Sequence, residues 1–225
     1  MEVLPALAHP TNTVIFFPAP PPIYFRYVPV LPPIITSCRQ KPIPKPTKRT
    51  ITVRWHPPPV GWVKVNVDGS SKGNPGESAA SAICRSSEGK WIFGCTTRIG
   101  FTNSFMAEVW GIVQGLTMAW NSGFRKVILE SDCLAAVNRV LGEDYQDPKH
   151  LCSHLILACR QLLKRDWICQ VRHVYREANF CADFLASNFR HLPMGRNYFI
   201  APPPELEKLM EEDLVGPGTT RIIKC

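Results

Sequence analysis

Four acidic residues stand where a strand or a helix is expected to begin or end: Asp68, Glu108, Asp132 and Asp183. His173 lies ten residues before the last of them. Clustered carboxylates repel one another, and Mg²⁺ or Mn²⁺, which prefer oxygen ligands, relieve that repulsion. Two such ions about 4 Å apart can polarise a phosphodiester and activate water. Taken singly, each acid is better explained as surface charge or as a helix-dipole partner. The metal hypothesis therefore requires that the acids converge.

Asp68 closes the first strand that the sequence predicts, Trp62–Asp68. Val63, Val65 and Val67 alternate with polar residues, which is the period of a strand with one apolar side. The strand continues into SSKGNPG, a turn rich in Ser, Gly, Asn and Pro that can bring backbone close to a ligand. An aspartate at such a place is by itself more often a turn-former or a solvated charge.

The other three acids also lie at the ends of predicted elements. Helical spacing of apolar residues over Phe105–Asn121 puts Glu108 in a first turn, and the short strand Val127–Glu130 precedes Asp132. Asp183 lies early in a helix predicted over Ala178–Phe189. Further strands are predicted at Ser78–Arg85, Trp91–Thr97 and Trp167–Tyr175, and further helices from Leu134 and from Asp147. The order β-β-β-α-β-α-α-β-α indicates an α/β fold with a mixed sheet covered by helices.

The residues before this pattern differ in composition. Residues 1–60 hold 15 of the 22 prolines, and seven basic residues against Glu2 alone, in a chain whose formal net charge is +8. Repeated proline blocks helices and sheet ladders and interrupts each apolar run before it could span a membrane. We therefore expect a disordered, basic, proline-rich leader at 1–60, a folded domain at 61–193, and a tail at 194–225 with a short amphipathic helix, Glu205–Leu214. The leader is a candidate ligand for small adaptor domains, or an extension without a function of its own.

The nine cysteines are an odd number and form no CxxC pair. Most lie inside apolar patterns, which predicts reduced and largely buried thiols, as in an intracellular protein. His150, Cys152 and His154 suggest zinc, but a fourth ligand at usable spacing is missing. No targeting segment stands out, so nucleus or cytoplasm is the default compartment, and a monomer is expected.

Several motifs together resemble the type 1 ribonuclease H domain. They are Asp68-Gly-Ser with Gly73-Asn-Pro-Gly76, Met106-Ala-Glu108, Glu130-Ser-Asp132, and His173 with Asn179 and Asp183. Arg176-Glu-Ala-Asn179 with Ala182-Asp183-Phe-Leu-Ala186 is similar to the plant, reverse-transcriptase-like version related to non-LTR retrotransposons. The resemblance covers about Trp62–Pro193. It implies a five-stranded mixed sheet, with strands one to three antiparallel and helices on both faces.

The resemblance also implies an activity, namely endonucleolytic cleavage of the RNA strand of RNA–DNA hybrids with two Mg²⁺ ions, or Mn²⁺ in their place. Carried over by position, Asp68, Glu108, Asp132 and Asp183 would hold the metals, and His173 would act in proton transfer or product release. Substrate contacts are implied for four further residues: Gly73, Asn74, Asn103 and Asn179. The asparagines at 74 and 103 would reach RNA 2′-hydroxyls, which distinguish RNA from DNA.

One departure from the family concerns a basic element that binds the substrate. Some members carry an extra basic helix, whereas here only Lys164–Arg165 stand in its place before the fifth strand. Two alternatives to the enzyme therefore stay open. One is a catalytically inactive module that binds nucleic acid or a protein, and the other is a fragment with no selected role.

Overall fold

The computed structural model describes residues 48–142 and 151–224, and the architecture below is that of these residues. The strands are β1 Lys48–Val53, β2 Val63–Gly73, β3 Gly76–Arg85, β4 Trp91–Thr102, β5 Lys126–Ser131, β6 Ile168–His173, β7 Gly195–Phe199 and β8 Thr219–Lys224. The helices are α1 Ser104–Asn121, α2 Leu134–Leu141, α3 Ser153–Leu163, α4 Phe180–Asn188 and α5 Pro204–Val215, with a 3-10 turn, η1 Arg176–Ala178, before α4.

Six strands form the main sheet, in the order β6-β5-β2-β3-β4-β7. β2, β3 and β4 are antiparallel neighbours, whereas β5 and β6 run parallel to β2. The expected mixed sheet is thus confirmed, and its first three predicted strands, which correspond to β2, β3 and β4, are antiparallel. The expected number of five strands is wrong. β7 adds a sixth strand by pairing with β4 from Gly94 to Thr97. Its five residues are too few for a local pattern to reveal a strand.

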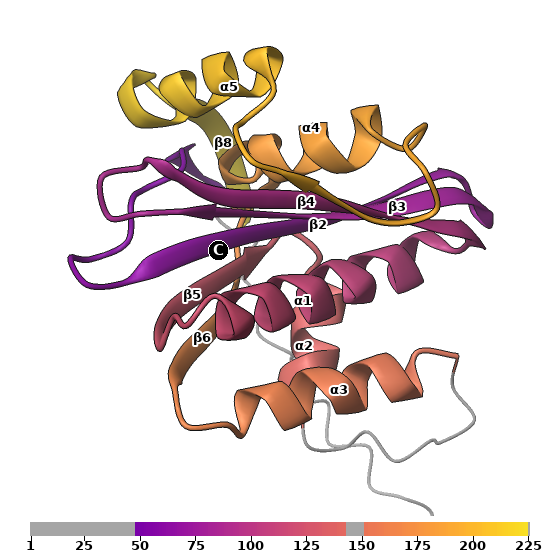
Figure 1. The fold of residues 1–225 in the computed structure, drawn as a ribbon. Coiled ribbons are helices and arrows are strands. Elements are labelled where there is room, and N and C mark those ends of the chain that lie inside the picture. The colour runs from indigo at the N-terminus through magenta and orange to yellow at the C-terminus, as the bar shows by residue number, and fades with distance from the viewer. Residues whose placement is uncertain (1–47, 143–150, 225) are drawn as a thin grey trace, which may run out of the picture. The chain divides into compact units, whose positions relative to one another are not determined.

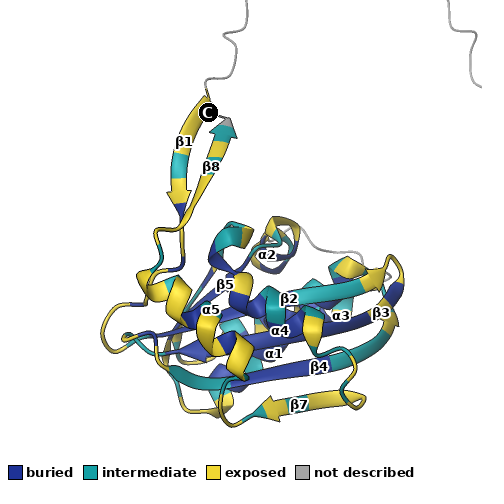
Figure 2. Cartoon of the chain, turned by 90° about the horizontal axis from the view of Figure 1, so that it is seen from above, coloured by how far each residue is buried: buried dark blue, intermediate teal, exposed yellow. Residues whose placement is uncertain are grey.

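Helices cover both faces of this sheet (Figure 1). On one face lie α1, α2 and α3, and the spacing of Val109, Ile112 and Leu116 turns one side of α1 toward Val65 and Val67. On the other face lie α4 and α5, where Leu185 and Leu206 pack with Ile83 of β3. Figure 2 shows the resulting pattern, with buried residues along the central strands and exposed ones on the outer sides of the helices. None of the described helices is long and apolar enough to cross a bilayer.

Part of the segment expected as a disordered leader is instead structured. Residues 1–47 lie outside the described residues, but Lys48–Val53 is a strand that pairs antiparallel with β8 of the tail. The segment KRTITV has no proline and several β-branched residues, so it can form a ladder once a partner strand is available. After it comes Trp55, only 1% exposed. The expected helix of the tail is α5, which buries Leu206 and Met210 against the domain.

The remaining elements lie close to their predicted bounds. β2 extends five residues beyond Asp68, and β4 extends five residues beyond Thr97. The helix expected to start at Asp147–Pro148 is described from Ser153 onward, because 143–150 fall outside the described residues. His150, one of the three residues that suggested zinc, also lies outside the described residues. Every cysteine in the described part is a free thiol. Cys84, Cys95, Cys159 and Cys181 are buried, as their apolar surroundings predict, whereas Cys133, expected in the same way, is half-buried.

Candidate functional site

The site begins with an unusually close approach between β2 and α1. A Cβ at Gly69 would lie 2.2 Å from backbone atoms of both Ala107 and Glu108, and one at Gly111 would lie 2.9 Å from the carbonyl oxygen of Asp68. Only glycine allows that spacing. Asn103 sets the start of the helix, because its Oδ1 accepts a hydrogen bond from the Met106 N–H at 2.8 Å. The first two turns of α1 are therefore held against the middle of β2, where Asp68 lies.

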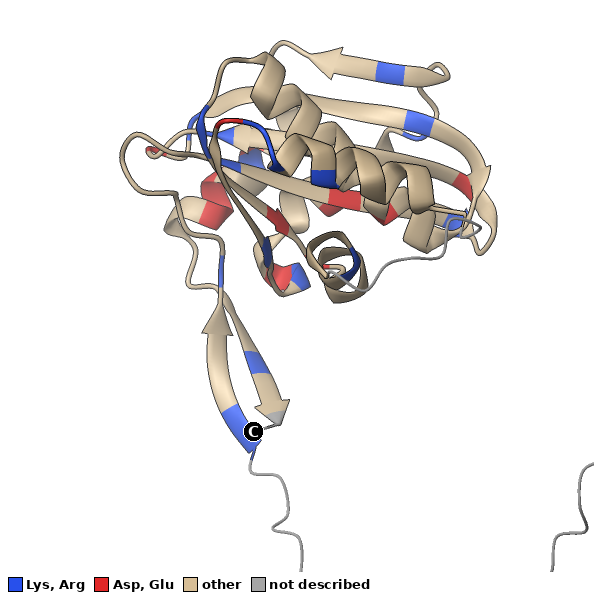
Figure 3. Ribbon diagram, turned by 90° about the horizontal axis from the view of Figure 1, so that it is seen from below, with Lys and Arg blue, Asp and Glu red and all other residues tan. Residues whose placement is uncertain are grey.

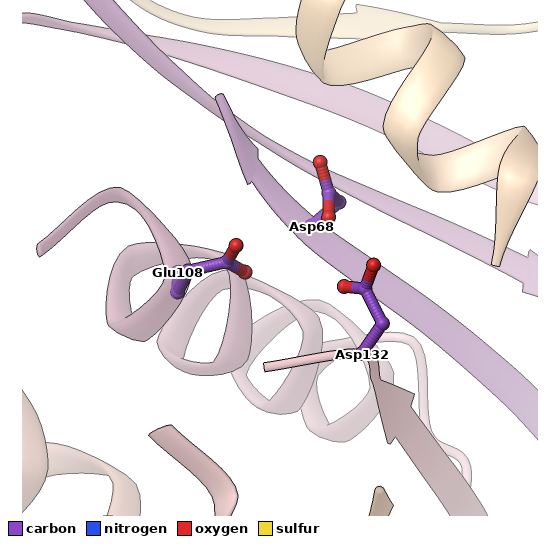
Figure 4. Close-up of side chains that lie close together, drawn as sticks. All are labelled: Asp68, Glu108 and Asp132. Atoms are coloured by element: carbon purple, nitrogen blue, oxygen red, sulfur yellow. The ribbon is translucent and has the colours of Figure 1, made fainter. Parts of the chain in front are cut away.

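Three of the predicted acids converge at this point. Asp68 comes from β2, Glu108 from α1 and Asp132 from the residue after β5, and their carboxylate oxygens lie within 4.8 Å of one another. Figure 4 shows the three side chains directed toward a common centre. The Gly69 N–H donates to Glu108 Oε2 at 3.1 Å and fixes the orientation of that carboxylate. β2 and β5 are parallel neighbours whose last pair is Val67 opposite Ser131, so Asp68 and Asp132 follow side by side directly after it.

The arrangement is electrostatically costly without a cation. Burial, and then the negative charges of Glu108 and Asp132, raise the pKa of Asp68 well above its usual range. Burial, and then the charge of Asp132, raise the pKa of Glu108 to about 8. No described lysine or arginine forms an ion pair with any of the three. Three hard oxygen donors without a cationic partner from the protein are a donor set that fits a divalent cation such as Mg²⁺.

Asp183, the fourth predicted acid, is not part of the close group. Its Oδ1 accepts a hydrogen bond from Arg176 Nη2 at 2.9 Å, an ion pair that is partly exposed. It nevertheless contributes to raising the pKa of both Asp68 and Glu108, which places its charge at the margin of the site. Arg176, in the turn before α4, was not predicted as a functional residue.

His173 ends β6 beside the acid group. Its Nε2 lies 3.2 Å from the carbonyl oxygen of Asp132, and its ring makes an edge contact with Tyr175 at a centroid distance of 5.9 Å. The side chain is half-buried. It is therefore close to the acids and still reachable from solvent, as a group that exchanges protons with a substrate must be.

Asn179, predicted as a substrate contact, lies beneath the site instead. It is 1% exposed, and its Nδ2 donates to the carbonyl oxygen of Val67 at 2.9 Å and approaches Asp132 Oδ1 at 3.4 Å. Its Oδ1 accepts from Asn66 Nδ2 at 3.1 Å. The amide thus ties the middle of β2 to the carboxylate of Asp132, so its role in this structure is positional.

Asn66 is the centre of a buried polar network that pattern analysis missed. Its Oδ1 accepts from Trp55 Nε1 at 2.8 Å and from Arg85 Nη2 at 3.3 Å, and its Nδ2 donates to Glu130 Oε2 at 3.2 Å. Lys64 forms an ion pair with Glu130 at 2.6 Å. The polar side of β2 is therefore covered rather than solvated. The only signal in the sequence was that the polar residues Lys64, Asn66 and Asp68 alternate with valines on one strand.

Arg85 links this network to the tail. Its guanidinium stacks over the Trp55 ring at 3.6 Å from the centroid, and its Nη1 pairs with Asp213 Oδ2 of α5 at 2.7 Å. Both partners are nearly fully buried. A continuous set of polar contacts thus runs from α5 through Arg85, Asn66 and Asn179 to Asp132. Segments on both sides of the expected domain support the site.

Of the remaining predicted substrate residues, Gly73 and Asn74 lie at the turn of the β2–β3 hairpin, and Asn103 is the N-cap of α1. Gly73 has a φ of +104°, which favours glycine, and Asn74 follows it. Asn74 Oδ1 accepts from the Ser104 N–H at 3.1 Å, which ties the hairpin turn to the start of α1 beside Asn103. The amide nitrogens of Asn74 and Asn103 bond to no described residue. The turn is five residues beyond Asp68, roughly 17 Å along the strand.

Comparisons with known proteins agree with this architecture. Residues 66–189 match the family model described as reverse transcriptase-like. A protein of Arabidopsis thaliana named after ribonuclease H is 38% identical over 172 residues, which are 76% of this chain and 27% of that protein. The chain thus spans about a quarter of the length of this curated relative.

Two solved structures are similar as well. Ribonuclease H1 of Halobacterium salinarum is 26% identical, with a TM-score of 0.52 over 56% of this chain and 96% of that one. The N-terminal ribonuclease H domain of a Mycobacterium tuberculosis protein is 25% identical, with a TM-score of 0.52 over 56% of this chain and 91% of that chain. Both are covered nearly completely, so the likeness extends over a whole ribonuclease H fold.

Proposed function

Because this chain belongs to the reverse transcriptase-like family, we propose that it is an endoribonuclease that hydrolyses the RNA strand of RNA–DNA hybrids with divalent metal ions. The observation that carries the proposal is the convergence of Asp68, Glu108 and Asp132 within 4.8 Å. These acids are scattered over the chain, and no packing requirement explains why three mutually repelling groups should meet. The products would be a 5′-phosphate and a 3′-hydroxyl.

The donor set suits Mg²⁺, with Mn²⁺ as a substitute. Asp68, Glu108 and Asp132 would be ligands of the first ion, and Asp183 would join in holding a second after exchanging its contact with Arg176. Bound ions would supply Lewis-acid polarisation of the phosphodiester and activation of water. The acids would also be relieved of their mutual repulsion on binding, which converts electrostatic strain in the free protein into metal affinity.

The protein's own groups keep this site in place. The Gly69 N–H orients Glu108, and the Asn179 amide orients Asp132. With Nε2 of His173 donating to the Asp132 carbonyl oxygen, Nδ1 is the nitrogen left to exchange a proton with the substrate or to assist product release. Each of these contacts holds one acid or one proton carrier beside the same centre.

Selection of RNA would fall to the β2–β3 turn and the start of α1. The free amide nitrogens of Asn74 and Asn103 are candidates for donation to RNA 2′-hydroxyls or to minor-groove acceptors. Gly73 keeps that turn free of a side chain that would obstruct a backbone. Contacts of this kind report helix shape rather than base identity, so we expect cleavage with little sequence preference.

The test is cleavage of a hybrid labelled on its RNA strand by the purified full chain, with Mg²⁺ and with EDTA. Asp68→Asn is the disabling variant. Glu88→Gln, which removes an exposed acid far from the site, is the matched control. We expect metal-dependent cleavage by the wild type and by the control, and at least a hundredfold loss in Asp68→Asn. Equal cleavage by wild type and Asp68→Asn would refute the proposal.

One observation favours a second candidate, a module that binds nucleic acid without cleaving it. In this structure Arg176 already pairs with Asp183, so the fourth acid is engaged by the protein itself. An inactive wild type that still retards the hybrid on a gel would support the binding module. Cleavage activity that is higher in Arg176→Gln than in wild type would instead show that this arginine inhibits an active enzyme by holding Asp183.

A further inference from the structure

β1 and β8 form a separate two-stranded sheet made from segments at opposite ends of the described chain. They pair antiparallel over six positions, from Lys48 opposite Lys224 to Val53 opposite Thr219. Neither strand contains an acidic residue, and Arg54 follows directly after β1. Figure 3 shows this arm, which ends at the C-terminus label, with blue segments and no red one. We call β1, β8 and Arg54 the basic arm.

The basic arm contributes little to the hydrophobic core. Lys48, Arg49 and Arg54 are exposed, and 66% of the surface of Ile222 is open to solvent. Val53 at the root is the only buried residue of β1. An isolated two-stranded ribbon that buries so little is marginal in water, so its persistence calls for a ligand or a firm attachment. None of these three bases forms an ion pair with a described residue.

The arm is attached next to the carboxylate site. Arg221 of β8 donates from Nη1 to both carboxylate oxygens of Glu177, at 2.7 and 2.8 Å. Its guanidinium carbon lies 4.4 Å from the centroid of the Tyr175 ring. Tyr175 in turn contacts His173, whose Nε2 lies 3.2 Å from the Asp132 carbonyl oxygen. A chain of successive side-chain contacts therefore leads from β8 to the acid group.

A polyanion at the acid site needs positive charge close by. The acid group repels phosphate, and the segment between α3 and β6 offers only Lys164 and Arg165. Contacts from lysine and arginine to phosphates supply most of the sequence-independent affinity of nucleic-acid-binding proteins. The basic arm is the acid-free, positively charged element that the structure attaches to the edge of the site.

We propose that the basic arm binds the sugar–phosphate backbone of the nucleic acid beside the site, with Lys48, Arg49 and Arg54 as its phosphate contacts. This inference rests on the proposed function for the identity of the ligand, an RNA–DNA hybrid. Arg221 is already engaged by Glu177 and would orient the arm rather than bind phosphate. The arm thereby gives segments from both ends of the described chain a part in substrate affinity.

The proposal is tested by hybrid binding rather than by cleavage. The variant Lys48→Gln/Arg49→Gln/Arg54→Gln is compared with wild type by fluorescence anisotropy on a short labelled hybrid in EDTA, across a series of salt concentrations. A charge-matched control changes three exposed lysines elsewhere to glutamine: Lys90, Lys126 and Lys208. All changed side chains are exposed, so melting temperatures should agree within about 2 °C, which a thermal scan checks.

Removing one lysine or arginine that binds a phosphate should weaken hybrid binding about 8-fold at 0.1 M salt, and should lower the slope of log K against log salt by about 0.9. We expect affinity at 0.1 M salt to fall at least about fiftyfold in the arm variant, with a slope lower by about 2 to 3, and to change much less in the control. Equal affinity and slope in the arm variant and wild type overturn the proposal, as does a wild type that does not bind the hybrid. Weaker binding by the arm variant upholds it even if the wild type proves not to cleave, which separates the arm from the proposed activity.

Discussion

Replacing Glu108 by glutamine should stabilise the metal-free protein while removing its function. The pKa of Glu108 is raised from an ordinary value of 4.5 to about 8, chiefly by burial and by the charge of Asp132. Between these two pH values the folded state binds more protons than the unfolded chain, so metal-free stability falls as pH rises through that window. Relative to acid pH, where Glu108 is protonated in both states, this one group lowers the free energy of unfolding by about 4 kcal/mol at about pH 7.5.

Glutamine removes the charge and keeps an oxygen that can accept the Gly69 N–H. Part of the gain is offset by burying the new amide. We therefore expect Glu108→Gln to be about 2–4 kcal/mol more stable than wild type in EDTA at about pH 7.5, a rise in melting temperature of about 5–15 °C. Near pH 5 the difference should shrink to less than about 1 kcal/mol, because wild-type Glu108 is then protonated in the folded state.

Bound Mg²⁺ should largely cancel this difference in stability. Wild type should gain about 2.7 kcal/mol at a Mg²⁺ concentration of 100 times its Kd, whereas Glu108→Gln lacks one of the ligands and should gain much less. The assay is differential scanning fluorimetry of the full chain over pH 5–8, with EDTA and with Mg²⁺. Glu88→Gln, the exposed control, should melt together with wild type throughout. A variant that melts below wild type in EDTA at about pH 7.5 would contradict the reasoning.

Three further predictions concern how the site is supported. Gly69→Ala should cost about 3 kcal/mol or more in urea denaturation and reduce the Mg²⁺-induced rise in melting temperature, because a Cβ would meet backbone of α1 at 2.2 Å; an unchanged Mg²⁺ shift would disprove it. Asp213→Ala should cost about 3–5 kcal/mol by leaving the Arg85 guanidinium buried and unpaired, whereas Arg85→Met combined with Asp213→Leu should recover most of that stability; an equally unstable double variant would argue against an electrostatic cause. The fragment 61–193, close to the span expected from sequence, should show no cooperative melting by circular dichroism because it lacks the Trp55 and α5 contacts; a sharp transition would show that the terminal segments are dispensable.

Local patterns predicted most elements of the domain because strand and helix periods are carried by neighbouring residues. The alternating valines before Asp68 correspond to β2, and the helical spacing after Phe105 corresponds to α1. Asp132 and Asp183 could be placed at element ends for the same reason, whereas Asp68 lies in the middle of β2 and Glu108 beyond the first turn of α1. Their residue type made a divalent cation the expected ligand only on the condition that they converge, and it was the family resemblance that implied this convergence.

What the tertiary structure decided depends on residues far apart in the chain. Ile51 lies opposite Arg221 in the β1–β8 ladder, a pairing that no local period encodes. The burial of Asn66 and the change of Asn179 from a substrate contact to a support also arise from such distant contacts. Asp183 turned toward Arg176, although its position in the helix equally permitted a place among the other acids. Periodicity specifies which face of an element is apolar, whereas the partner of a polar side chain is settled only when all elements pack together, because each buried donor and acceptor must then find a hydrogen-bond partner.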